Sequence, residues 1–143
     1  MNESFFIYRQ RHKQWVARIA SEIKGVIFET APFDIIDMTG RFIEVKINES
    51  KDAKQKYLVH LSADEAKFGQ LMPLWVLLVI PNIEAYLIPF NKLKVAPMKE
   101  HLVGNFMQKS HLVWINKELR EHYVFKININ LPIKSGVSSE DSK

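Results

Sequence analysis

Seven consecutive apolar residues, from Leu74 to Ile80, constrain the fold of this chain more than any other stretch. The run is far too short to span a membrane, and its length and composition suit a β-strand. A strand without polar residues at alternate positions is typical of the centre of a sheet that other layers cover on both faces. The sequence therefore predicts an α/β domain built around a covered sheet.

The pattern of the remaining residues places other elements around that strand. Apolar residues at helical spacing predict a helix over 5–24 that ends at Gly25. Ser62 and Glu65 have the spacing of a capping box, which predicts a helix ending near Gln70. We expect strands over 26–30, 33–38, 41–47, 57–61 and 84–88, then a helix over 98–108, a strand over 111–115, a helical turn over 117–122 and a last strand to 129.

Length and composition indicate a single domain. The chain has 143 residues, of which 47% are hydrophobic and 25% charged, as is ordinary for a globular protein with its own core. We expect residues 1–131 to form this domain and the polar tail 132–143 to be disordered. There is no cysteine for a disulfide or a thiolate site. With no basic leader and no long apolar run, we expect a cytoplasmic protein without a membrane partner.

Residues 32–47 have the pattern of a β-hairpin, with two apolar runs around a Thr-Gly turn. Alternation along the second strand puts Glu44 and Lys46 on one face. A two-residue loop would turn Asp34 away from Glu44. A three-residue loop ending at a left-handed Gly40 would instead place Asp34 directly opposite Glu44. The glycine at the third loop position favours the second arrangement.

Two carboxylates paired across strands repel each other, so this pair favours a bound cation. Asp34, Glu44 and the main-chain carbonyl of Val45 offer the oxygen ligands that Mg²⁺ and Mn²⁺ prefer. A cation held there would polarise a phosphate and lower the pKa of an attacking water, while Lys46 would orient that water or offset charge on phosphorus. The pattern predicts phosphodiester hydrolysis. The alternative is a half-exposed hairpin whose charges are simply solvated.

Pro32-Phe33-Asp34 followed by Glu44-Val45-Lys46 resembles the motif of the PD-(D/E)XK nuclease superfamily, with one residue inserted between the proline and the first acid. The resemblance extends over roughly residues 8–90. It implies a restriction-endonuclease-like αβββαβ core, with a mixed central sheet flanked by helices. It also implies a magnesium-dependent endodeoxyribonuclease of the restriction, homing or junction-resolving type, with manganese as a substitute. Cutting both strands of a duplex would require a homodimer or a higher homo-oligomer.

The superfamily often adds an acidic residue on the first helix, and this chain departs from that pattern. The usual spacing back from Asp34 falls near Gln14, whose amide oxygen can hold a metal ion or its water. Glu22 is an acid on the same predicted helix, but it lies close to the C-terminal end. We therefore place Gln14 in the catalytic site and keep Glu22 as the alternative.

The formal net charge of +4 suits a polyanionic partner. Lysines follow the hairpin in a polar loop, and arginines lie on the first predicted helix, where they would contact phosphates without reading sequence. We expect DNA as the partner, with RNA possible. The alternatives are solvated surface charges and, for the chain as a whole, a non-catalytic nucleic-acid-binding or assembly module on the same fold. The proposed phosphate contacts are Lys51, Lys54, Lys56 and Arg11.

Overall fold

The computed structural model describes residues 3–48, 57–103 and 106–130. Two sheets and three α-helices account for most of these residues. In chain order the elements are α1 (Glu3–Ile23), β1 (Val26–Ile27), β2 (Ile35–Ile36), β3 (Phe42–Ile47), β4 (Tyr57–Leu61), α2 (Ala63–Leu71), β5 (Leu74–Ile80), β6 (Glu84–Pro89), the 3-10 helix η1 (Phe90–Lys92), β7 (Lys99–Val103), β8 (Phe106–Ile115) and α3 (Lys117–His122).

The central sheet has five strands in the order β1-β2-β3-β5-β6. Strand β3 runs parallel to β5, and the other neighbours are antiparallel, so the sheet is mixed. Every residue of β5 except Trp75 is buried, as its apolar sequence predicts. The predicted α/β fold, with a mixed central sheet flanked by helices, is confirmed.

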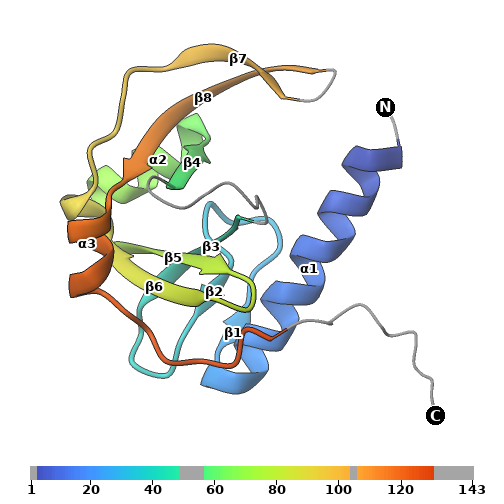
Figure 1. Ribbon diagram of the computed structural model, residues 1–143, viewed down its shortest axis with the longest axis vertical. Helices are drawn as coiled ribbons and strands as arrows, with labels where there is room; N and C mark the ends of the chain where they lie inside the picture. The colour runs from blue at the N-terminus through green and yellow to red at the C-terminus, as the bar shows by residue number, and fades with distance from the viewer. Residues whose placement is uncertain (1–2, 49–56, 104–105, 131–143) are drawn as a thin grey trace.

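The two faces of the central sheet are covered by different layers (Figure 1). Helix α1 packs Trp15 and Ile19 against one face, where Val45 of β3 lies. A second sheet, in the order β4-β8-β7, covers the other face together with α2. Because side chains alternate along β3, the residues between its α1-facing positions point toward α2 and the second sheet. Glu44 and Lys46 occupy two of these positions.

The C-terminal third differs from the prediction. The prediction of a helix over 98–108 is wrong, because β7 and β8 pair there as an antiparallel hairpin. Strand β8 continues into the buried residues Val113 and Ile115, so a strand anchored in the core extends back through this segment. The strand predicted over 57–61 is present as β4 and pairs with β8. Tertiary pairing has overridden local preference in the segment predicted as a helix.

The last strand, expected to 129, is also absent from the described residues. After α3 the chain is extended and makes an isolated bridge between Val124 and Tyr86. Phe125 N–H donates to the Ala85 carbonyl, so the segment still borders β6. The predicted tail 132–143 lies outside the described residues. The helical turn over 117–122 is confirmed. Within the described part of the chain, no helix has the length and apolar character needed to cross a membrane.

Gly69 lies inside α2, where glycine is normally unfavourable. A Cβ at this position would lie 2.4–2.6 Å from ring carbons of Phe90. Only glycine therefore allows α2 to approach η1 so closely. The neighbouring Phe68 packs edge-on against Phe42 of β3, with the ring centroids 5.3 Å apart. These contacts hold α2 beside the face of β3 that carries the charged residues.

The β2–β3 hairpin has the predicted three-residue loop. Asp37 N–H donates to the Arg41 carbonyl across the base of the loop, and Gly40 has a φ of 89°. Ile35 pairs with Ile43 and Ile36 with Phe42, which is the register that a three-residue loop gives. One residue further, Asp34 N–H donates to the Ile43 carbonyl at 2.8 Å, so the ladder departs from the expected direct pairing of Asp34 with Glu44.

Asp37 is a structural acid of this turn. One carboxylate oxygen accepts hydrogen bonds from Thr39 N–H, Thr39 Oγ1 and Arg41 N–H, at 2.8–3.0 Å. The other accepts from Arg41 Nε at 2.7 Å. Burial acts to raise the pKa of Asp37, but these hydrogen bonds and the arginine charge together lower the pKa below 3.8.

We expect Asp37→Ala to lower the free energy of unfolding by about 2 kcal/mol at neutral pH, because buried donors lose their acceptor. The pKa of Asp37 is depressed in the folded state, so its stabilisation is present above pH 3.8 and is lost as the pH falls through the folded pKa. The cost of the substitution should therefore shrink at about pH 3. Urea unfolding at both pH values measures it, and an equal cost at both would contradict this account.

Candidate active site

Three charged side chains from the hairpin meet on one face of the central sheet. Asp34 Oδ2 accepts a hydrogen bond from Val45 N–H at 2.8 Å, which fixes the carboxylate against β3. Lys46 Nζ lies 3.4 Å from Glu44 Oε2. The structure thus places Asp34, Glu44 and Lys46 around the same part of β3.

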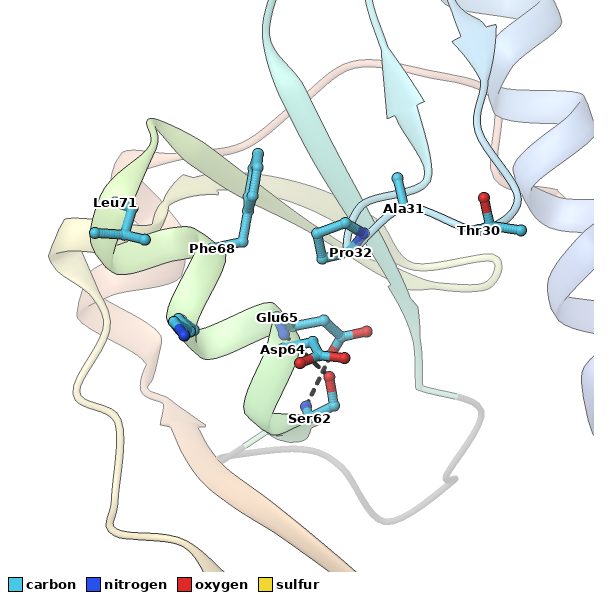
Figure 2. Close-up of a pocket in the computed structure, with 9 residues that line it drawn as sticks. Thr30, Ala31, Pro32, Ser62, Asp64, Glu65, Phe68 and Leu71 are labelled. Atoms are coloured by element: carbon cyan, nitrogen blue, oxygen red, sulfur yellow. Dashed lines mark hydrogen bonds between the residues drawn. The ribbon is translucent and has the colours of Figure 1, made fainter.

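A fourth charged residue, Glu65 of α2, completes this group. Its Oε1 lies 3.1 Å from Lys46 Nζ and also accepts from Ser62 N–H at 2.9 Å. Figure 2 shows Glu65 and Ser62 joined at the start of α2. Glu65 and Glu44 also interact, since each carboxyl group shifts the pKa of the other. Lys46 therefore lies between two glutamates from distant parts of the chain.

Burial dominates the electrostatics of the site. It raises the pKa of Glu44 well above 4.5, and the charges of Asp34 and Glu65 add to this effect while Lys46 opposes it. Burial also raises the pKa of Asp34 above 3.8, against the hydrogen bond from Val45 N–H and smaller charge effects. The pKa of Lys46 is raised above 10.5, because its two glutamates outweigh the burial that would lower it. The three carboxyl groups of the site therefore outnumber its one ammonium, that of Lys46.

Helix α1 contributes His12 to the site rather than Gln14. His12 Nε2 lies 2.9 Å from the Val45 carbonyl oxygen and 3.7 Å from Asp34 Oδ2. Gln14 is exposed and lies two residues further on, roughly 200° around a helix of 3.6 residues per turn. Glu22 accepts a hydrogen bond from Asn128 N–H at the far end of α1. The structure corrects the placement of Gln14 and excludes Glu22 from this group.

The donor atoms of the site fit a hard divalent cation. Asp34 and Glu44 supply carboxylate oxygens, and burial raises the pKa of both. A divalent cation would favour their charged forms. The Val45 carbonyl already contacts His12, but a carbonyl oxygen has a second lone pair. Within the described ranges, no three Asp, Glu, His or Cys side chains are grouped to hold a metal ion by themselves. Main-chain, water or substrate oxygens would therefore have to complete the coordination.

A groove of about 390 Å³ lies beside these residues. Figure 2 shows it between α2 and the segment around Pro32, two residues before Asp34. Glu65 lines both the groove and the charged group. Of the predicted phosphate contacts, Arg11 is exposed on α1 next to His12, whereas Lys51, Lys54 and Lys56 lie outside the described residues.

No protein-family model matches this chain, and a search of curated proteins finds no match. Among solved structures, the fold is similar to Hjc of Archaeoglobus fulgidus, a Holliday junction resolvase from an archaeal hyperthermophile. The TM-score is 0.49 and the sequence identity is 17%. The match covers 77% of this chain and 90% of the resolvase chain.

Sequence reasoning missed two members of the site, His12 and Glu65. For His12, the spacing from Asp34 predicted the correct stretch of α1 but selected Gln14, which lies on the other side of the helix. For Glu65 the capping-box pattern gave the correct helix start. Nothing local in the sequence indicated that this helix start meets Lys46, because their contact depends on how α2 packs.

We expect His12→Ala to slow cleavage by about 10- to 100-fold, as loss of a residue that orients ligands typically does. The imidazole holds the Val45 carbonyl and lies beside Asp34, so its loss frees two candidate ligands. Gln14→Ala on the exposed side of α1 is the matched control and should cleave normally. Initial rates on plasmid DNA in magnesium compare the two, and the opposite ranking would restore Gln14 to the site.

Proposed function

We propose that this protein is a metal-dependent endonuclease that hydrolyses phosphodiester bonds in DNA. The observation that carries the proposal is the buried group of Asp34, Glu44 and Lys46, in which Val45 N–H holds the Asp34 carboxylate against β3 and Lys46 Nζ lies 3.4 Å from Glu44 Oε2. Carboxylates buried near one another are unfavourable unless positive charge neutralises them. The PD-(D/E)XK pattern of these same residues supports the proposal.

In this proposal, Asp34, Glu44 and the Val45 carbonyl hold Mg²⁺, or Mn²⁺ in its place. The bound ion would polarise the scissile phosphate and lower the pKa of a water. Lys46 orients the attacking water or offsets the charge that builds on phosphorus. His12 keeps the Val45 carbonyl and Asp34 in place from the α1 side.

The substrate assignment rests on charge and on the size of the domain. A net charge of +4 favours a polyanion, and Lys51, Lys54, Lys56 and Arg11 are our candidates for phosphate contacts. One domain with one such site cuts one strand at a time. A homodimer or higher homo-oligomer would therefore be needed for both strands, as in a restriction, homing or junction-resolving enzyme.

The test is incubation of the purified protein with supercoiled plasmid, a four-way DNA junction and RNA, each with Mg²⁺, Mn²⁺ or EDTA. We expect cleavage of DNA in either metal and none in EDTA. Cleavage of RNA alone would assign an RNA-directed nuclease. Tight binding without cleavage of any substrate would favour a non-catalytic nucleic-acid-binding or assembly module.

A further inference from the structure

We propose that Glu65 is a positioning residue that fixes the ammonium of Lys46 within the catalytic group. The inference rests on the proposed nuclease function and adds a residue from α2 to it. Lysine is a point charge on a flexible four-carbon stem, so a catalytic lysine needs a second group to set its position. Glu65 supplies that group from outside the hairpin.

Distances support this role. Lys46 Nζ is closer to Glu65 Oε1, at 3.1 Å, than to Glu44 Oε2, at 3.4 Å. Without Glu65, the ammonium would have Glu44 as its anchor in this group, and Glu44 is one of the two carboxylates proposed to hold the metal. Lys46 would then be free to swing with that side chain.

Glu65 is itself held rigidly. The oxygen that contacts Lys46 also accepts from Ser62 N–H at 2.9 Å, while Ser62 Oγ accepts from Glu65 N–H at 3.0 Å. These reciprocal bonds form the capping box that starts α2. A single oxygen thus joins the first turn of a helix to the ammonium of the site. The position of Lys46 is therefore tied to the start of α2.

This sharing also separates Glu65 from the proposed metal ligands. Its Oε1 already accepts from two donors, Lys46 Nζ and Ser62 N–H. No third acid or histidine joins Asp34 and Glu44 as a ready metal cluster in the part of the chain that the structure describes. Position, rather than coordination, is the role that these contacts support.

Two substitutions distinguish position from charge. Glu65→Gln keeps the length of the side chain and an oxygen that can accept from both Ser62 N–H and Lys46, but removes the charge. Glu65→Asp keeps the charge and shortens the reach. We expect the glutamine variant to keep Lys46 in place and to lose far less activity than the aspartate variant. We expect kcat of the aspartate variant to fall about 10- to 100-fold with KM unchanged.

Ser62→Ala is the matched control, because it removes the other half of the same capping box without touching Lys46. It should lower thermal stability and reduce kcat much less than Glu65→Asp does, because Ser62 N–H still donates to Glu65 Oε1. A fast aspartate variant with a slow glutamine variant would overturn the proposal in favour of a charge effect, and two fast variants would overturn it outright. Weakened binding of Mg²⁺ alone in both variants, measured by calorimetry, would make Glu65 a ligand and also overturn it.

A readout independent of activity separates this inference from the proposed function. The ammonium of Lys46 should give a slowly exchanging ¹H–¹⁵N signal, assigned by its absence in Lys46→Met. The signal should persist in Glu65→Gln and be lost in Glu65→Asp. If the wild type cleaves nothing but these signals behave as stated, the proposed function fails and the placement of Lys46 by Glu65 stands. Loss of the signal in neither variant would overturn the placement.

Discussion

Replacing Asp34 by asparagine is expected to slow DNA cleavage by about a thousandfold or more, because the loss of a proposed metal ligand would remove several kcal/mol of transition-state stabilisation. The amide oxygen of asparagine can still accept the hydrogen bond from Val45 N–H, which is 2.8 Å long in the structure. The hairpin should therefore keep its register. Rates of plasmid cleavage in magnesium, with calorimetric titration of Mg²⁺, measure both effects.

The control for Asp34→Asn is Asp64→Asn, which removes an exposed acid from the first turn of α2. Asp64 lines the neighbouring groove, whereas the ion pairs of Lys46 are with Glu44 and Glu65. A similar loss of activity in both variants would indicate a general effect of charge. Full activity and unchanged magnesium affinity in Asp34→Asn would remove Asp34 from the site.

Lys46→Met is expected to abolish cleavage and to lower the free energy of unfolding by about 3 kcal/mol at neutral pH. The methionine fills much of the same volume but leaves Glu44 and Glu65 facing each other without the ammonium between them. Binding of DNA in EDTA should change little, since Lys46 acts on the transition state. Urea unfolding and fluorescence anisotropy with labelled DNA separate stability from binding.

Lys117→Met provides the comparison for this experiment, since the Lys117 side chain is 78% exposed and its ion pair is with another exposed side chain, Glu121. It should leave cleavage and stability nearly unchanged. Loss of DNA binding in Lys46→Met as large as its loss of cleavage would assign Lys46 to substrate binding. Cleavage at the wild-type rate would remove it from the chemistry.

The part of the site that the sequence predicts correctly is the part that is local in the chain. Strand alternation and the position of Gly40 are enough to place Asp34, Glu44 and Lys46 together, because a hairpin register follows from its own loop. Strand β5 can likewise be predicted from its unbroken apolar run. These features depend on residues within a few positions of one another.

The parts that the sequence did not predict depend on packing between distant segments. His12 reaches Val45 across 33 residues, and Glu65 reaches Lys46 across 19. Neither contact leaves a local pattern, because each is set by how a helix lies on the sheet. The β7–β8 hairpin was mistaken for a helix for a related reason, since its strand character comes from pairing and from the anchoring of Val113 in the core.

The close approach of α2 to η1 has a consequence for how this protein can change. Gly69 carries no charge and lies four residues beyond Glu65, yet the absence of its side chain sets how near the helix sits to Phe90. Any larger residue would act as a wedge at one end of the helix and tilt the other end, where Glu65 meets Lys46. Activity can thus be tuned or lost through a position that touches none of the chemistry, and a survey confined to charged residues would overlook it.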